Sequence, residues 1–264
     1  MIDFEVQKEL RERFNPEGSN LRDRQLKMLE MLTYLDEICK ENDIKYWLGA
    51  GNLLGAVRHG EYIPWDDDVD IEMLREDYEK LIKILESETT YNLQTYKNDP
   101  YYLYSFSKLR DPNSIVLEDS IYDKCLHKGI FIDILVIEKN NLLFAWFAEW
   151  VLCRFLLPFT KNNKHVNERF FQSIKKIYFK FLMLLRFCAK LFVNKKYRYG
   201  YGVGFHQYLF DTDDIFPLSE IKFEGLTFNA PKNPDAYLKR MYGDYMKLPD
   251  FDKIRSHGSA VVFL

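Results

Sequence analysis

Four carboxylates lie within five positions of this chain, at residues 66–70, where the order is Asp-Asp-Asp-Val-Asp. In a strand, residues two apart point to the same face, so Asp66, Asp68 and Asp70 would line up, with Glu72 continuing the row. Carboxylates that share a face raise one another's pKa and destabilise the fold unless a cation neutralises them. Oxygen ligands at this density suit Mg²⁺ or Mn²⁺. We therefore predict that Asp66, Asp68 and Asp70 bind such a metal ion; the alternative is a solvated acidic turn.

A glycine-bearing segment precedes the acidic run. A short apolar stretch, residues 45–48, predicts a buried strand, and the glycines after it permit a tight turn into one or two turns of helix. The first amides of a helix have no partner inside it and point outward, so this geometry attracts anions. We predict that Gly51 and Asn52 contact phosphate, and that Arg58 and His59, which follow closely, add positive charge. A plain strand-to-helix turn is the alternative.

Residues 48–59 and 63–71 resemble the signature of the LicD family. The similarity continues at further short stretches: residues 75–79, 108–111, 127–134 and 242–249. It implies a nucleotidyltransferase-type fold. Bacterial members of the family attach phosphocholine to cell-surface polysaccharides, and fukutin-type sugar-phosphate transferases are distant relatives. Asn52 stands where the family pattern has Ser or Thr, and residues 135–137 replace a Phe-Pro-Leu-like run. The motif does not identify the transferred group.

A single acid, Asp133, interrupts the apolar run of residues 130–137, which predicts a buried strand. A lone carboxylate in an apolar strand is costly unless it is paired. The resemblance implies that Asp133 is a third acid facing Asp68 and Asp70, either as a metal ligand or as the base that takes the acceptor's proton. The alternative is a structural carboxylate paired to an arginine or a backbone amide.

Two cations, Lys108 and Arg110, lie two residues apart and so share one face of the strand predicted over residues 101–109. They could hold the phosphates of a donor or pair with surface acids, and the sequence does not decide between these roles. His257, near the C-terminus, is a further residue that could touch substrate.

The composition, with 264 residues, 47% hydrophobic and 16% aromatic, excludes general disorder and suffices for one substantial core. Strands mixed with helices, without a regular strand–helix–strand rhythm, predict an α+β fold with a mixed, nucleotidyltransferase-like sheet. We expect a single catalytic domain over residues 1–264, with residues 141–200 as a helical insertion or subdomain. The remaining predicted elements are a helix at 21–41 with an apolar face (Leu26, Leu29, Leu32, Leu35, Ile38), a helix at 76–86, strands at 91–96 and 114–117, a hairpin at 221–228 and a helix at 234–242.

The net charge of −3 conceals a strong segregation. Residues 142–200 hold twelve of the 37 Lys and Arg residues but only two acids, and they are rich in Phe and Trp, while the rest of the chain is acidic. Charged residues break the apolar runs, which argues against a transmembrane helix of about twenty residues. Helices with cations on one side and Trp, Phe and Leu on the other are typical of membrane surfaces. We predict contact with an anionic membrane; ordinary core-facing helices with a solvated basic face are the alternative, and the acidity of the remaining chain disfavours a nucleic-acid partner.

The four cysteines are far apart, with no Cys-x-x-Cys spacing, which favours reduced thiols in a cytoplasmic protein. Cys125 and His127 have the spacing of half a zinc site without a second half. The first residues have neither the basic nor the apolar region of a signal peptide. Together with the basic segment, these features predict a cytoplasmic protein held peripherally at the inner face of the cytoplasmic membrane.

The predicted phosphate-binding segment at Gly51 and Asn52 is followed by aligned carboxylates. This order predicts a Mg²⁺-dependent phosphotransferase with a nucleotide-activated donor, for which the resemblance favours CDP-choline. A hydroxyl of a glycan, such as teichoic acid, lipopolysaccharide or a lipid-linked precursor, would attack the distal phosphorus. The alternatives are nucleotidyl transfer that releases pyrophosphate, transfer of a sugar or polyol phosphate such as ribitol phosphate, and a non-enzymatic membrane scaffold, which the intact acids disfavour. For a choline head group, Trp47, Tyr62 and Trp65 are the aromatic candidates.

Overall fold

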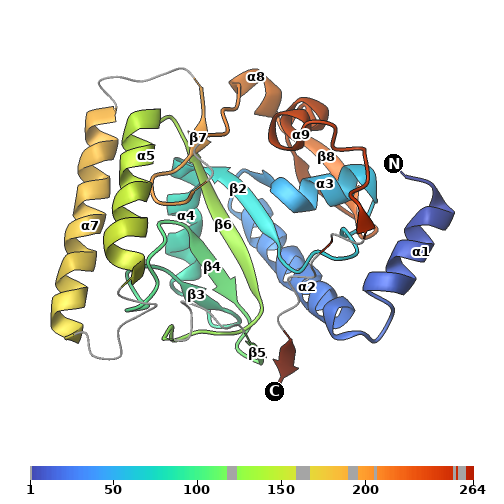
Figure 1. The fold of residues 1–264 in the computed structure, drawn as a ribbon, viewed down its shortest axis with the longest axis horizontal. Coiled ribbons are helices and arrows are strands. Elements are labelled where there is room, and N and C mark those ends of the chain that lie inside the picture. Colours follow the sequence, from blue (N-terminus) through green and yellow to red (C-terminus); the bar gives the residue numbers. More distant parts are fainter. Residues whose placement is uncertain are drawn as a thin grey trace.

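The computed structural model describes residues 2–117, 124–158, 167–189, 196–204, 207–251, 254 and 260–264. At its centre lies a six-stranded sheet with the strand order β1-β2-β6-β4-β3, and β7 pairs with β6 (Figure 1). β2 and β6 run parallel, and the other pairs in this sheet are antiparallel. The strands are β1 (Tyr46–Leu48), β2 (Asp70–Leu74), β3 (Asn92–Gln94), β4 (Ser107–Arg110), β6 (Phe131–Glu138) and β7 (Arg198–Tyr199). The mixed sheet and its helices confirm the predicted α+β class.

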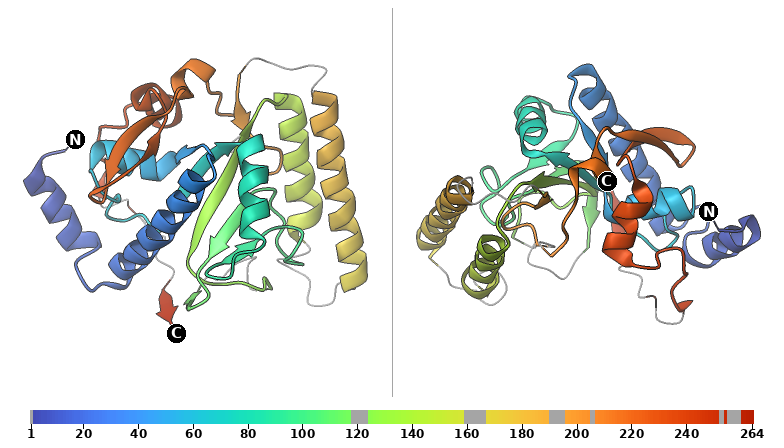
Figure 2. Two further views of the ribbon diagram at one scale, coloured as in Figure 1. Left: turned by 180° about the vertical axis from the view of Figure 1, so that it is seen from behind. Right: turned by 90° about the horizontal axis from the view of Figure 1, so that it is seen from above.

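Two helices, α2 (Asn20–Glu41) and α4 (Arg75–Leu85), cover one face of this sheet (Figure 2). That face is apolar because alternate residues of β2 and β6 are Ile, Met or Val, and Ile71 and Ile134 are fully buried. On the same face, Tyr78 of α4 pairs its hydroxyl with Ser107 Oγ at 2.6 Å. The opposite face of the sheet carries the polar side chains of the same strands, including Asp70.

The buried face of α2 differs from the predicted apolar face in the first half of the helix. Helix α2 lies where the sequence predicts it, but Leu26, expected in its apolar face, is 42% exposed, whereas Met28 and Met31 are fully buried. The buried face is rotated because Arg24 and Gln25, in the preceding turn, bond to the acidic run and so face the protein interior.

The acidic run is a loop, and the strand predicted for it begins only at Asp70. The backbone oxygens of Asp66 and Asp68 accept hydrogen bonds from side chains of α2 and of α3 (Ala50–Arg58), where a strand would bond to a neighbouring strand. The predicted alternation of faces therefore holds only from Asp70 onward.

The strand predicted over residues 101–109 is also shorter than expected and is limited to β4. The preceding residues turn around Asp99, whose carboxylate accepts a hydrogen bond from the amide of Tyr101 at 3.0 Å. A turn of this kind gives the backbone a local partner in place of a sheet partner.

A pair of helices forms one end of the molecule (Figures 1 and 2). The described helices of the basic segment are α5 (Leu142–Val151), the π-helical turn η1 (Leu152–Leu156) and α7 (Glu168–Ala189). They share a core of their own, which includes Ala145, Ala148, Leu152, Phe171, Tyr178 and Leu182. Within the described ranges, no helix is long and apolar enough to cross a membrane.

The C-terminal third contains the predicted hairpin, β8 (Ser219–Phe223) with β9 (Leu226–Ala230), and the predicted helix α9 (Pro234–Tyr242), which Gly243 ends with a φ of 67°. Elements that the sequence pattern did not predict are α1 (Phe4–Phe14), β7, which lies inside the segment expected to be helical, α8 (Thr212–Ile215) and β10 (Val261–Phe263), which pairs with β5 (Ser114–Val116). The four cysteines, all within the described ranges, form no disulfide, and Cys39 and Cys125 are buried.

Candidate active site

Asn52 fixes the end of the acidic run from the first turn of α3. Its side chain is 1% exposed, its Nδ2 donates to the backbone oxygen of Asp68 at 3.2 Å, and its Oδ1 accepts from the amide of Asp70 at 2.6 Å. Both ends of the side-chain amide are thus engaged by the loop. The sequence predicts that Asn52 contacts phosphate; in this structure its side chain positions the acids.

Helix α2 holds the beginning of the same loop. Gln25 Nε2 donates to the backbone oxygen of Asp66 at 2.8 Å, and Arg24 Nη1 lies 3.1 Å from Asp67 Oδ2. Arg24 is 2% exposed, so Asp67 is paired with a buried cation. The four acids of the run therefore differ in role, and Asp67 joins the loop to α2 through its ion pair with Arg24.

Three of the acids lie close together: Asp68, Asp70 and Asp133. Asp70 and Asp133 are register partners on the parallel strands β2 and β6, so their side chains lie on the same face of the sheet. Burial, followed by the negative charges of Asp68 and Asp133, raises the pKa of Asp70 well above its usual value. Burial and the charge of Asp133 raise the pKa of Asp68 to about 6. The fold thus brings the predicted acids together, where they repel one another.

Asp66 lies beside the start of α3. A Cβ placed on Gly51 would be 2.8 Å from Asp66 Oδ2, so only glycine allows this approach. Burial and the charge of Asp68 raise the pKa of Asp66 well above its usual value. Gly51, predicted to contact phosphate, thus also makes room for an acid.

Asp133 forms an ion pair with Lys108, whose Nζ lies 2.5 Å from Asp133 Oδ1. Lys108 is 2% exposed, and its ammonium lies 3.5 Å above the centre of the Phe131 ring. Burial lowers the pKa of Lys108, and the charge of Asp133 opposes that shift. This lysine is therefore held next to the acids, and its partner is an acid of the site.

The donor set fits a magnesium-type ion held by two carboxylates. In the part of the chain that is described, no three His, Cys, Asp or Glu side chains converge closely enough to enclose a metal. Mg²⁺, however, commonly uses one or two carboxylates and takes its other ligands from water and substrate phosphates. Asp68 and Asp70 supply such oxygens, and the buried Oδ2 of Asp66 has no hydrogen-bond partner among the described residues.

Arg58 and His59 are buried and bonded within the protein. Arg58 Nη1 donates to the backbone oxygen of Tyr245 at 2.8 Å, and its Nε donates to His59 Nε2 at 2.9 Å. Burial and the positive charge of Arg58 lower the pKa of His59 to about 3. His59 is therefore neutral at pH 7, which corrects the expectation that it adds positive charge toward a phosphate.

Arg110 likewise has partners inside the protein. It is 2% exposed, its Nε donates to Gln94 Oε1 at 2.6 Å, and its Nη1 donates to the backbone oxygen of Gly129 at 2.8 Å. Its guanidinium lies 4.7 Å from the centre of the Phe131 ring. These contacts join β3, β4 and the start of β6, so we assign Arg110 a structural role.

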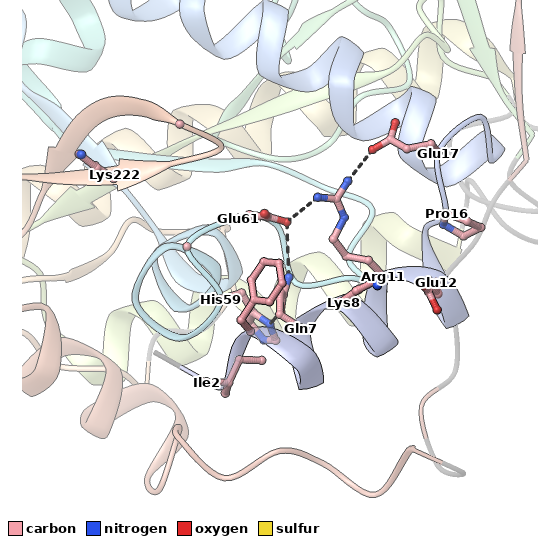
Figure 3. Close-up of a pocket in the computed structure, with 13 residues that line it drawn as sticks. Ile2, Gln7, Lys8, Arg11, Glu12, Pro16, Glu17, His59, Glu61 and Lys222 are labelled. Carbon is pink, nitrogen blue, oxygen red and sulfur yellow. Dashed lines mark hydrogen bonds and ion pairs between the residues drawn. The ribbon is translucent and has the colours of Figure 1, made fainter.

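A cavity of about 590 Å³ lies between α1, the turn after α3 and the β8–β9 hairpin (Figure 3). Arg11 crosses it and pairs with Glu61 at 3.1 Å and with Glu17 at 2.5 Å. His59 belongs to its lining, whereas none of the described residues that line it comes from the acidic loop. The cavity and the acids are therefore separate features of the molecule.

Sequence reasoning did not predict the partners of Glu72. This buried carboxylate accepts hydrogen bonds from Trp47 Nε1 at 2.8 Å, from Tyr237 at 2.5 Å and from Tyr199. Burial raises its pKa to about 7, and the three donors oppose the shift. Tyr237 also accepts from the amide of Ala50 at 3.2 Å, so it connects α9 to the first residue of α3.

Tyr242, at the end of α9, is a second residue to which the sequence analysis gave no role in the site. Burial of its hydroxyl and then the charges of Asp70 and Asp66 raise its pKa, and 43% of the residue remains exposed. Arg24 and Gln25 could have been found as polar residues on the buried face of an amphipathic helix, and Tyr242 could have been found because it opens the family-like stretch of residues 242–249. His257 lies outside the described residues.

These observations define an α+β protein with a carboxylate site beside a glycine-bearing helix start. Residues 43–184 match the family described as LicD/FKTN/FKRP, nucleotidyltransferase domain, and the chain belongs to this family. It is 26% identical over 255 residues to the lipopolysaccharide cholinephosphotransferase LicD of Haemophilus influenzae, covering 90% of this chain and 95% of that protein. It is 46% identical over 48 residues to ribitol 5-phosphate transferase FKRP of Homo sapiens, covering 18% of this chain and 10% of that protein. The predicted family resemblance is confirmed.

The replacement Asn52→Ala should reduce the free energy of unfolding by about 1–3 kcal/mol, because it leaves the amide of Asp70 and the oxygen of Asp68 without their partner. Urea denaturation measures the change, and Asn113→Ala, at an exposed position, is the matched control. A loss no larger than that of the control would show that Asn52 does not hold the loop.

The stability of the protein should fall as the pH rises in metal-free buffer. The pKa of Asp68 is raised to about 6 in the folded state. Between about pH 4 and pH 6 the folded state therefore binds more protons than the unfolded state. The free energy of unfolding falls as the pH rises through this range. We expect a loss of about 2–3 kcal/mol between pH 4 and pH 8 that Asp68→Asn removes. Thermal unfolding followed across this range, with the exposed Asp213→Asn as control, measures it; an unchanged slope in Asp68→Asn would contradict the assignment.

Proposed function

We propose that this protein is a Mg²⁺- or Mn²⁺-dependent phosphotransferase with a nucleotidyltransferase-like core. In this proposal it moves phosphocholine, or a similar phospho-alcohol, from a CDP-linked donor to a hydroxyl of a cell-surface glycan such as lipopolysaccharide or teichoic acid. The observation that carries the proposal is the shared neighbourhood of Asp68, Asp70 and Asp133 at the β2–β6 pair. The likeness to the cholinephosphotransferase of Haemophilus influenzae over 90% of the chain supports the choice of reaction.

Asp68 and Asp70 are the residues that would hold the metal ion, which would neutralise the phosphate oxygens of the donor. Gly51, at the start of α3, would contribute a backbone amide to the same phosphates. Asn52 would act indirectly, because its side chain fixes the backbone of both acids. The burial and mutual repulsion of these carboxylates favour a bound cation, which is the physical support for the metal assignment.

Asp133 would take the proton of the acceptor hydroxyl. As the hydroxyl oxygen forms its bond to the distal phosphorus, the bond from that phosphorus to the bridging oxygen breaks, and cytidine monophosphate leaves with the bonding electrons. Lys108 lies 2.5 Å from Asp133, so its positive charge stays beside the reacting groups when Asp133 becomes neutral. Phosphoryl transfer depends mainly on such positioning and charge neutralisation.

Two other reactions are compatible with the same site. Attack at the inner phosphate of a nucleoside triphosphate would be nucleotidyl transfer, with pyrophosphate as the leaving group. Transfer of ribitol phosphate is favoured by the local likeness to ribitol 5-phosphate transferase FKRP, which covers 48 residues of this chain. Incubation with CDP-choline, CDP-ribitol or nucleoside triphosphates, with and without Mg²⁺, followed by mass spectrometry of the leaving group, separates the three reactions.

The acceptor in this proposal is a glycan still linked to lipid at the inner face of the cytoplasmic membrane. A nucleotide-activated donor and a lipid-linked acceptor meet at that surface, and the basic helical segment agrees with such a location.

Replacing Asp68 or Asp70 by Asn should lower the transfer rate by at least about 100-fold, because each substitution removes a charged oxygen that the metal and the transition state need. Circular dichroism should show that both variants keep the fold. Asp213→Asn, at an exposed position outside the site, should keep normal activity. Near-normal turnover of either site variant in Mg²⁺ would refute the metal assignment.

The head group should be choline in preference to ethanolamine, since only the methylated cation fills an aromatic cage. Of the three aromatic candidates, Trp47 and Tyr62 are in the core, with exposures of 0% and 1%, so their proposed cage role is withdrawn. Trp65 is partly buried, with its ring 5.3 Å from Phe14 and 6.3 Å from Phe251. Trp65→Leu should reduce the preference for choline by about 2- to 30-fold, measured by competition between CDP-choline and CDP-ethanolamine. A preference of the wild type for CDP-ribitol would exclude a choline site.

A further inference from the structure

The outer face of α5 is made of large apolar side chains. Leu143, Trp146, Phe147 and Trp150 are each between 43% and 73% exposed on this ten-residue helix. Monomeric proteins rarely leave contiguous apolar patches of this kind in water, and such patches mark interaction sites. The helix is buried on its other side, through Ala145 and Ala148, so the exposed side chains are not part of its packing.

The outer face of α7 combines apolar and basic residues. Its buried side chains, such as Tyr178 and Leu182, follow the helical period. The side chains on the opposite face are all exposed and include no acid over Arg169–Phe187: Arg169, Phe170, Ser173, Lys176, Ile177, Lys180, Met183, Leu184 and Phe187. Cations thus alternate with apolar side chains along one side of the helix.

The two outer faces form one surface, which we call the aromatic–basic face. Phe147 of α5 contacts Phe181 of α7, with 5.7 Å between ring centres. On α5 and η1, Phe147 stacks on Trp150 at 5.8 Å, and Trp150 meets Phe155 at 5.4 Å. Figures 1 and 2 show the two helices side by side at the end of the molecule away from α1.

Lys175 does not belong to this face, although it precedes Lys176 in the basic segment. It is 4% exposed, and its Nζ donates to the backbone oxygens of Asp99 at 2.6 Å and Pro100 at 2.9 Å. It therefore anchors α7 to the loop before β4. Lys161, Lys164, Lys190 and Lys195, which the sequence analysis counted in the segment, lie outside the described residues.

We propose that the aromatic–basic face docks on the surface of an anionic phospholipid bilayer, with α5 and α7 lying in the plane of the interface. Trp and Phe side chains partition into the headgroup boundary, while neighbouring Lys and Arg side chains meet the lipid phosphates. The pattern on α7, with Lys176 and Lys180 beside Ile177 and Leu184, provides both contributions on one surface. This inference specifies the membrane location given under the proposed function by naming the residues that meet the lipid, and it does not depend on the reaction.

A second copy of this chain is a poorer occupant of the same face. A twofold contact brings the same patch of two molecules together. Here both patches would carry Arg169, Lys176 and Lys180, and the face has no acid over Arg169–Phe187 to pair with them, which disfavours association. An anionic bilayer has the opposite charge, so charge complementarity favours the lipid surface.

Vesicle co-sedimentation tests the proposal without donor or turnover, so its outcome is independent of the catalytic assignment. The full chain should bind vesicles of phosphatidylglycerol and phosphatidylcholine at low salt, bind more weakly as salt is added, and bind poorly to pure phosphatidylcholine. The double variant Lys176→Glu/Lys180→Glu should bind at least about tenfold more weakly. The matched control Lys83→Glu/Lys232→Glu reverses two exposed lysines elsewhere and should bind like the wild type.

Tryptophan fluorescence adds a readout at the surface itself. Trp146 and Trp150 are exposed, whereas Trp47 is fully buried, so binding to anionic vesicles should shift the emission to shorter wavelength, and brominated lipids should quench it. Trp146→Ser/Trp150→Ser should remove both effects. Failure of the wild type to sediment with anionic vesicles at low salt, or equal binding to neutral vesicles, would overturn the proposal. A dimer in analytical ultracentrifugation that Trp146→Ser/Trp150→Ser dissociates would assign the face to a second copy instead.

Discussion

Repulsion between buried carboxylates is the constraint on which the rest of this site depends. Asp68 and Asp70 lie beside Asp133, and burial adds to the cost of their charges. The protein holds them by contacts to the loop backbone, from Asn52 and Gln25, which fix geometry without neutralising charge. Such an arrangement costs stability in the metal-free protein and leaves the acids preorganised for a cation, as expected for a functional site.

The support of the site extends beyond the part of the chain that matches the family. Glu72, on the same face of β2 as Asp70, is bonded by Tyr199 of β7 and Tyr237 of α9, both C-terminal to residue 184. Tyr237 also contacts the amide of Ala50, where α3 begins. The C-terminal helix thus fixes both the start of α3 and the strand that carries Asp70, which explains how residues distant in sequence determine the geometry of the acids.

The sequence predicted which acids come together better than it predicted their contacts. The acidic run stands out because carboxylates that share a face repel one another unless a cation neutralises them, and the strand around Asp133 stands out because its neighbours are continuously apolar. The substrate roles of Arg58, His59 and Arg110 rested on charge alone, and burial with internal partners is a tertiary property that charge does not reveal. The sequence predicts a strand over the acidic run because acidic and apolar residues alternate there. In the structure, side chains of α2 and α3 donate to backbone oxygens of the run that would bond to a neighbouring strand. No local sequence pattern places those side chains next to the run.

We propose above that Asp68 and Asp70 bind a divalent cation. Electron paramagnetic resonance of Mn²⁺ tests it most directly, with the wild type and the double variant Asp68→Asn/Asp70→Asn titrated in the presence of CDP-choline. We expect one bound Mn²⁺ per wild-type chain, displaced by excess Mg²⁺, and loss of that binding in the double variant. Mn²⁺ binding by the variant with wild-type affinity, or no binding by the wild type, would contradict it.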